Sequence, residues 1–129
     1  MRTQGLLFFF VVLIFFIFTG CDDNTQQIIN ELTFPEKNVS YSEHVQTLFN
    51  VRCNYVHCHG STVASKLMLV SYYEATRYPG IIVKGMPDNS ILNQRLEGRL
   101  RPMPPIGDPL SPNFINGVRT WVKEGGNNN

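Results

Sequence analysis

The chain has 129 residues, of which 43% are hydrophobic, and its net charge at neutral pH is only +1. Its lysines and arginines are scattered along the sequence, which argues against a nucleic-acid-binding protein because that function needs clustered positive charge. The length suits one small domain. Such a domain has a thin core, and it often needs a disulfide, a metal or a cofactor to be stable.

Residues 1–20 have the pattern of a secretory signal peptide. Arg2 supplies positive charge, and Leu6–Phe18 is an apolar run of 13 residues, shorter than the roughly 20 that a transmembrane helix needs. The run ends in "FTGC", which is similar to the site cut by bacterial lipoprotein signal peptidase. We therefore expect a lipoprotein signal peptide over 1–20 and lipidation of Cys21. The protein would then be exported and anchored to a membrane, facing the periplasm or the cell exterior. The alternative is a plain signal peptide or an uncleaved anchor.

The mature chain divides into a polar segment and one domain. Residues 21–39 have no sustained hydrophobic period, so we expect an acylated N-terminus followed by a flexible tether. The domain is expected over 40–126, and the asparagines at 127–129 are expected to be a disordered tail. If Cys21 carries lipid, Cys53 and Cys58 remain as a pair.

Apolar periodicity and capping signals predict an all-α domain, and no segment has a convincing strand pattern. Each expected helix begins at a residue that can cap a helix N-terminus, and the first two have a glutamate three residues later. The helices are expected over 40–53, 71–78, 88–98 and 111–124, beginning at Ser40, Ser71, Asp88 and Ser111. The stretch "RPMPPIGDP", 101–109, must be a loop because its four prolines exclude a helix or a central strand.

The segment "CNYVHCHG", residues 53–60, is the main candidate site. A c-type haem is usually attached at C-x-x-C-H, where two cysteines form thioethers and the histidine ligates the iron. Cys58 and His59 match that pattern, but Cys53 lies two residues further away than usual. Two alternatives are open. The segment could supply ligands to a zinc site, with His44 or His57 contributing, or Cys53 and Cys58 could form a disulfide.

A methionine in the proline-rich loop favours the haem interpretation. Methionine is a common second axial ligand of c-type haem and raises its reduction potential. Met103 lies in "RPMPP", where the prolines stiffen an extended loop and can present the thioether at little entropic cost. Met86, in the loop "GMPDNS", is the competing candidate.

Four segments, in order, give the chain a resemblance to a known family. They are "VQTLFNVRC…CHG", "KLMLVSYYEA", "MPDNSILNQRL" and "MPPIGDPLSPNFINGVRTWVKEGG". Together they resemble the small class I cytochrome c domains of the planctomycete-type family over about 85 residues, from Tyr41 to Gly125. The resemblance implies a small helical cytochrome c-like fold around one haem. It also implies thioethers at Cys53 and Cys58 and axial ligation by His59 and Met103. The x4 spacing between the cysteines departs from the family pattern.

A haem with both axial positions filled has no open position for a substrate, so we expect a carrier of single electrons rather than an enzyme. Its expected partners are redox proteins and, through the N-terminal lipid, a membrane. One alternative is a haem-containing sensor or accessory subunit whose distal ligand is displaceable. The other is a disulfide-stapled lipoprotein without a cofactor. The sequence contains no Ser-His-Asp set, phosphate-binding loop or second haem motif that would indicate an enzyme.

Overall fold

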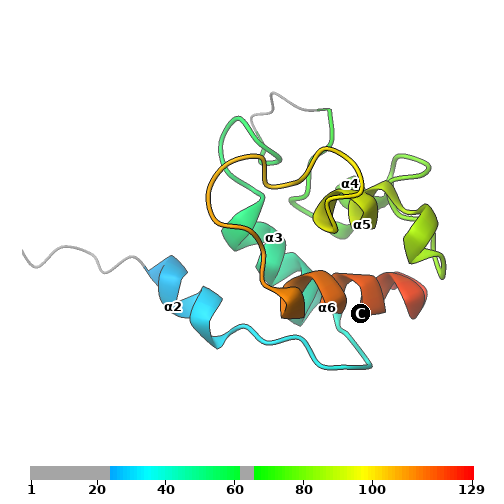
Figure 1. The fold of residues 1–129 in the computed structure, drawn as a ribbon, viewed down its shortest axis with the longest axis horizontal. Coiled ribbons are helices and arrows are strands. Elements are labelled where there is room, and N and C mark those ends of the chain that lie inside the picture. Colours follow the sequence, from blue (N-terminus) through cyan, green and yellow to red (C-terminus); the bar gives the residue numbers. More distant parts are fainter. Residues whose placement is uncertain (1–23, 62–65) are drawn as a thin grey trace, which may run out of the picture.

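The computed structural model describes residues 24–61 and 66–129, which fold into helices joined by loops, with no strand among them (Figure 1). The expected signal peptide and Cys21 lie outside these residues. Within them, no helix is both long enough and apolar enough to cross a membrane. The elements are α2 (Asn24–Glu31), the π-helix η1 (Tyr41–Val45), α3 (Gln46–Arg52), α4 (Tyr72–Thr76), the 3-10 helix η2 (Pro87–Asn89), α5 (Ile91–Leu96) and α6 (Pro112–Lys123).

The core forms where the continuous helix η1–α3 meets α6. Val45, Leu48 and Phe49 are buried on the first helix, as its apolar stripe predicted. On α6 the buried apolar side chains recur every three or four residues, so one face of that helix joins the same core. This helix pair places Cys53, the residue after α3, at one end of the core. The helical part of the fold prediction is therefore confirmed.

Most of the predicted helix starts are confirmed by side-chain caps. The hydroxyls of Ser40, Ser71 and Ser111 each accept a hydrogen bond from the backbone N–H three residues later. The first cap is only half of a capping box. The backbone N–H of Ser40 donates to Nδ1 of His44, 3.2 Å away, rather than to Glu43.

The predicted third helix begins later than expected. Asp88 lies in the 3-10 turn η2, and α5 starts only at Ile91. The Asp88 carboxylate does not cap a helix because both of its oxygens accept hydrogen bonds from the Arg119 guanidinium at 2.9 Å. Arg119 also pairs with Glu97, so one α6 side chain holds both ends of the η2–α5 segment.

The segment expected to be a flexible tether contributes to the core. It contains helix α2, and Phe34 and Val39 are buried beyond it. The Asn113 side chain accepts a hydrogen bond from the N–H of Phe34 at 2.9 Å and donates one to the carbonyl of Phe34 at 3.0 Å. The Phe34 ring occupies the space that a Cβ at Gly117 would fill, with the nearest ring atom only 2.1 Å from that position. The packed domain thus begins before residue 40.

The last three residues also differ from the expectation of a disordered tail. The Trp121 indole N–H donates to the carbonyl of Asn127 at 2.9 Å. The Asn129 side chain accepts from the N–H of Tyr41 at 2.8 Å, and its carbonyl accepts from the N–H of Ser42 at 2.9 Å. Asparagine side chains substitute here for backbone hydrogen bonds, which the low-complexity sequence did not reveal.

Replacement of Gly117 by alanine should destabilise the fold because the added Cβ collides with the Phe34 ring. Overpacking of this kind costs about 1–3 kcal/mol of unfolding free energy. Urea denaturation followed by circular dichroism measures the effect. Asn116→Ala, at an exposed position of the same helix, is the control and should leave stability nearly unchanged. Equal stability of the two variants would show that Phe34 does not dock on Gly117.

Candidate functional site

The loop 53–60 closes on itself through backbone hydrogen bonds. The N–H of His59 donates to the carbonyl of Cys53 at 3.2 Å, and the N–H of Cys58 donates to the carbonyl of Tyr55 at 3.0 Å. Gly60 is required at the end of the turn because a Cβ there would lie 2.9 Å from the carbonyl oxygen of Asn54. The two ends of the motif are therefore brought together despite the four intervening residues.

The residues between the cysteines form an outward bulge. Tyr55, Val56 and His57 are all exposed, and Val56 keeps 66% of its surface accessible. His57 adopts a left-handed backbone conformation with φ of 70°, which histidine tolerates better than most residues do. The Tyr55 hydroxyl turns back and donates to the carbonyl of Val51 at 2.7 Å. The x4 spacing is thus accommodated by an exposed bulge, while Cys53 and Cys58 remain half-buried at the base of the loop.

A backbone carbonyl orients the His59 ring. Nδ1 of His59 lies 2.8 Å from the carbonyl oxygen of Leu67. A carbonyl oxygen can only accept, so Nδ1 carries the proton and donates. This tautomer assigns Nε2 as the nitrogen that would ligate a metal, the usual arrangement for a metal-binding histidine.

The Cys53 thiol lies in a poorly solvated position at the end of α3. Burial raises the pKa of Cys53 to about 12, and the nearby Cys58 adds a smaller increase while Arg52 opposes it. As a protonated thiol, Cys53 is a poor nucleophile.

The proline-rich loop that carries Met103 is anchored at both of its ends. The N–H of Met103 donates to the carbonyl of Arg95, in the last turn of α5, at 3.2 Å. Further along the loop, the carbonyl of Asp108 accepts a hydrogen bond of 2.5 Å from the guanidinium of Arg52. Arg52 directly precedes Cys53, so this bond ties the loop to the end of α3, where the two segments run near each other (Figure 1). Met103 itself is half-buried.

Met86 lies in a different part of the domain. It is 56% exposed, and its turn is attached to the end of α6 by a hydrogen bond from Gly85 to the carbonyl of Val122. That end of α6 packs on Tyr41 through Trp121, with ring centroids 5.4 Å apart. Tyr41 begins the first helix, and Cys53 follows twelve residues later, about 18 Å along the axis. The structure therefore ties the loop that carries Met103, rather than the turn that carries Met86, to the residue before Cys53.

The histidines considered for a zinc site do not gather around the cysteines. His44 is half-buried beside Phe34, with ring centroids 5.6 Å apart. Its Nδ1 accepts a hydrogen bond from the N–H of Ser40. The His57 side chain is exposed on the bulge. Among residues 24–61 and 66–129, no three histidine, cysteine or acidic side chains converge on a position for a metal ion. A four-ligand zinc site is not assembled by the described residues.

A buried amide near the methionine loop lacks a partner in this structure. Asn93, on α5, is completely inaccessible, and neither polar atom of its side chain has a hydrogen-bond partner. Such a group costs stability unless something satisfies it. Asn93 lies two residues before Arg95, the α5 residue whose carbonyl anchors the Met103 loop.

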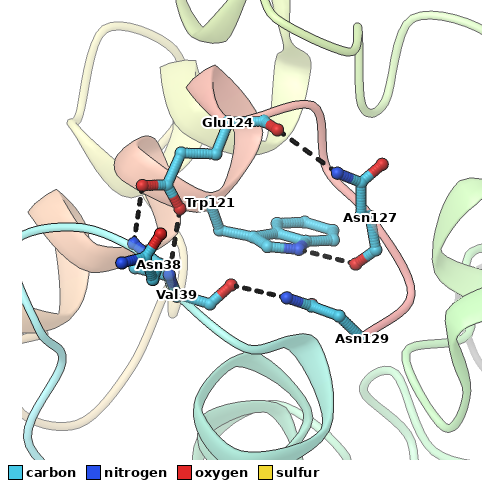
Figure 2. A pocket seen from close by; sticks show the side chains of 6 residues that line it. All are labelled: Asn38, Val39, Trp121, Glu124, Asn127 and Asn129. Carbon is cyan, nitrogen blue, oxygen red and sulfur yellow. Dashed lines mark hydrogen bonds between the residues drawn. The ribbon is translucent and has the colours of Figure 1, made fainter.

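A separate polar pocket of about 320 Å³ lies at the other end of the first helix (Figure 2). The Glu124 carboxylate accepts hydrogen bonds from the N–H groups of Asn38 and Val39, at 2.7 and 2.9 Å. Asn127 and Asn129 join the same set of contacts (Figure 2). These hydrogen bonds hold the last residues of the described chain against the start of the domain. We therefore place the functional site at "CNYVHCHG" and interpret this pocket as structural.

No protein-family model, curated protein or solved structure matches the chain. The assignment of the site thus depends on the residues and their geometry.

The sequence predicted Cys53, Cys58, His59 and Met103 as site residues, but it did not predict the groups that hold these segments in place. The carbonyl of Leu67 has no sequence signal because any residue could supply it. Asp108 could be suspected as a charged residue, yet only its backbone oxygen is used. Asn93 is the exception, since a polar residue within an apolar helix face is a visible anomaly.

We expect Cys53 to resist alkylation in protein produced without haem attachment. With a pKa of about 12, only about one thiol in ten thousand is ionised at pH 8, and the thiolate is the reactive form. Labelling by iodoacetamide, followed by peptide mass spectrometry, should be at least ~100-fold slower than in the same protein unfolded in urea, and it should accelerate up to about pH 12. Similar rates in folded and unfolded protein would contradict the buried position.

Proposed function

We propose that the protein is a monohaem c-type cytochrome that carries single electrons at the cell envelope. Cys53 and Cys58 would form the thioethers, with His59 and Met103 as axial ligands. The observation that best supports this is the hydrogen bond from Nδ1 of His59 to the carbonyl of Leu67, which fixes the imidazole in the tautomer that an iron ligand requires.

The attachment chemistry is supported by the placement of the two thiols. A thioether forms when a thiol adds across a haem vinyl group, with the sulfur bonding to one vinyl carbon and a hydrogen ending on the other. The closure of the loop brings the backbone of Cys53 to that of His59, next to Cys58, and Val56 and His57 are exposed on the bulge between the cysteines. The x4 spacing is therefore compatible with two attachments.

The chemistry supplied by a bound haem is reversible one-electron reduction of its iron. The chain's own residues set the conditions for that reaction. His59 is held in one tautomer, and Met103 is presented by a loop tied to both α5 and the end of α3. With His59 and Met103 both bound to it, the iron would have no position for a substrate and would serve electron transfer.

We further propose that the chain is an exported lipoprotein attached to a membrane through Cys21. The support is the sequence of residues 1–21, with its apolar run and its cleavage-site pattern. In that setting the folded segment from Phe34 onward is presented to redox proteins close to the membrane, and the acyl chains hold it there.

A pyridine haemochrome spectrum of exported protein, produced with cytochrome c maturation, tests the proposal. The expected result is a c-type spectrum with both vinyl groups saturated. Cys53→Ala should give the spectrum of a single thioether, and Cys58→Ala should reduce haem content more strongly because Cys58 adjoins His59. A colourless wild-type protein that still folds would support the disulfide-stapled lipoprotein and end the electron-carrier proposal.

Replacement of Met103 should identify the distal ligand. Met103→Ala should lower the reduction potential, because methionine ligation raises it, and should let the reduced protein bind carbon monoxide. Met86→Ala is the matched control and should change neither property, since Met86 is held at the far end of α6. Spectroelectrochemistry and carbon monoxide titration give the two readouts. Strong carbon monoxide binding by the wild-type protein at neutral pH would instead favour the sensor alternative.

A further inference from the structure

Three side-chain amides, spaced four residues apart, form a closed ring of hydrogen bonds with one carbonyl. The side-chain nitrogens of Gln46 and Asn54 both donate to Oδ1 of Asn50, at 2.8 and 2.9 Å. The same two nitrogens also donate to the carbonyl of Leu69, at 3.0 and 3.1 Å. An amide nitrogen has two hydrogens and each oxygen has two lone pairs, so these four bonds use every donor and acceptor site in the ring. We call the three side chains the amide ladder.

The orientation of the ladder is fixed at both of its ends. At the first end, the Tyr41 hydroxyl donates to Oε1 of Gln46. Burial raises the pKa of Tyr41 above its usual value, so this hydroxyl keeps its proton and remains a donor. At the other end, Oδ1 of Asn54 is buried and has no hydrogen-bond partner among the described residues. A buried oxygen without a partner costs stability, so Asn54 gives up one interaction in order to donate twice.

The ladder ends at the segment that orients His59. The N–H of Leu69 donates to the carbonyl of His59 at 2.9 Å, and the carbonyl of Leu67 accepts from Nδ1 of His59 at 2.8 Å. Residues 67–69 belong to no helix, and the side chain of Leu69 is buried in the core. The two bonds to the Leu69 carbonyl therefore attach this short segment to the side chains of Gln46 and Asn54.

We propose that Gln46, Asn50 and Asn54 are positioning residues for His59. The ladder holds residues 67–69 where the carbonyl of Leu67 receives the Nδ1 proton. The inference rests on the proposed function, because an effect on the reduction potential requires His59 as the iron ligand. A hydrogen bond donated by the second ring nitrogen makes histidine a more basic ligand, and a more basic ligand favours the oxidised iron. An intact ladder should therefore lower the reduction potential, and a broken one should raise it.

The test variant is Gln46→Met with Asn54→Leu, which removes the four donated bonds but keeps the size of both side chains and the net charge. The control is Gln27→Met with Asn116→Leu, the same two exchanges at exposed positions of α2 and α6. Spectroelectrochemistry of the exported full-length protein gives the reduction potential. Nuclear magnetic resonance of the reduced form gives the exchange rate of the Leu69 N–H and the resonance of the His59 Nδ1 proton.

In the test variant the Leu69 N–H should exchange at least about tenfold faster than in the wild type. The Nδ1 proton of His59 should move upfield as its hydrogen bond weakens, and the reduction equilibrium should shift about threefold or more towards the reduced form. The control should match the wild type in all three readouts. A test variant with an unchanged Nδ1 resonance and an unchanged potential would show that the ladder is only structural, and a lower potential would contradict the direction. Either result overturns the inference.

A milder pair of variants at the exposed Asn50 tests the ladder if the double variant does not fold. Only the side-chain oxygen of Asn50 belongs to the ring, so Asn50→Asp keeps the acceptor and Asn50→Leu removes it. Exchange of the Leu69 N–H should accelerate in Asn50→Leu and stay within about twofold of the wild type in Asn50→Asp. Equal exchange rates in the two variants would overturn the inference.

The readouts separate this inference from the proposed function. A wild-type protein that folds without haem would refute the proposed function, while the Leu69 exchange rate and the His59 Nδ1 resonance would still show whether the ladder positions the ring. A haem protein whose potential and Nδ1 resonance ignore the ladder would leave the proposed function standing and refute the inference.

Discussion

The packing of α6 against the first helix is the interaction on which the rest of the structure depends. It fixes the end of α3, and therefore Cys53, relative to Leu110, the buried residue at which the chain leaves the proline-rich loop. Because the segment from 53 to 61 and the loop after α5 contain no long helix of their own, their positions follow from this helix pair and from a few hydrogen bonds attached to it. Of these, the bond from Arg52 to Asp108 joins the two candidate ligand segments directly.

Local sequence signals predicted the helices well because caps and apolar stripes act over four residues or fewer. Ser40, Ser71 and Ser111 begin helices as expected. Contacts between residues distant in sequence were not predictable in this way. Phe34 sits in a polar segment, and its burial depends on the absence of a side chain at Gly117, 83 positions later. Asp88 is a residue type that often caps helices, but both of its carboxylate oxygens accept hydrogen bonds from the guanidinium of Arg119.

The candidate site likewise combines features that the sequence reveals with features that it does not. Residue types that carry chemistry were visible in the sequence, since cysteine, histidine and methionine stand at recognisable spacings. The atoms that orient them are mostly backbone carbonyls, those of Leu67, Arg95 and Asp108. Every residue has such a carbonyl, so no composition or spacing reveals which ones are used.

The two extra residues between the cysteines change the shape of the loop that joins them. In a shorter loop the residues between the cysteines have little freedom to leave the base of the turn. Here His57, in a left-handed conformation, lies within a bulge that exposes Val56, while the N–H of His59 still reaches the carbonyl of Cys53. The bulge therefore takes up the unusual spacing, and the backbone contact between the two ends of the motif is kept.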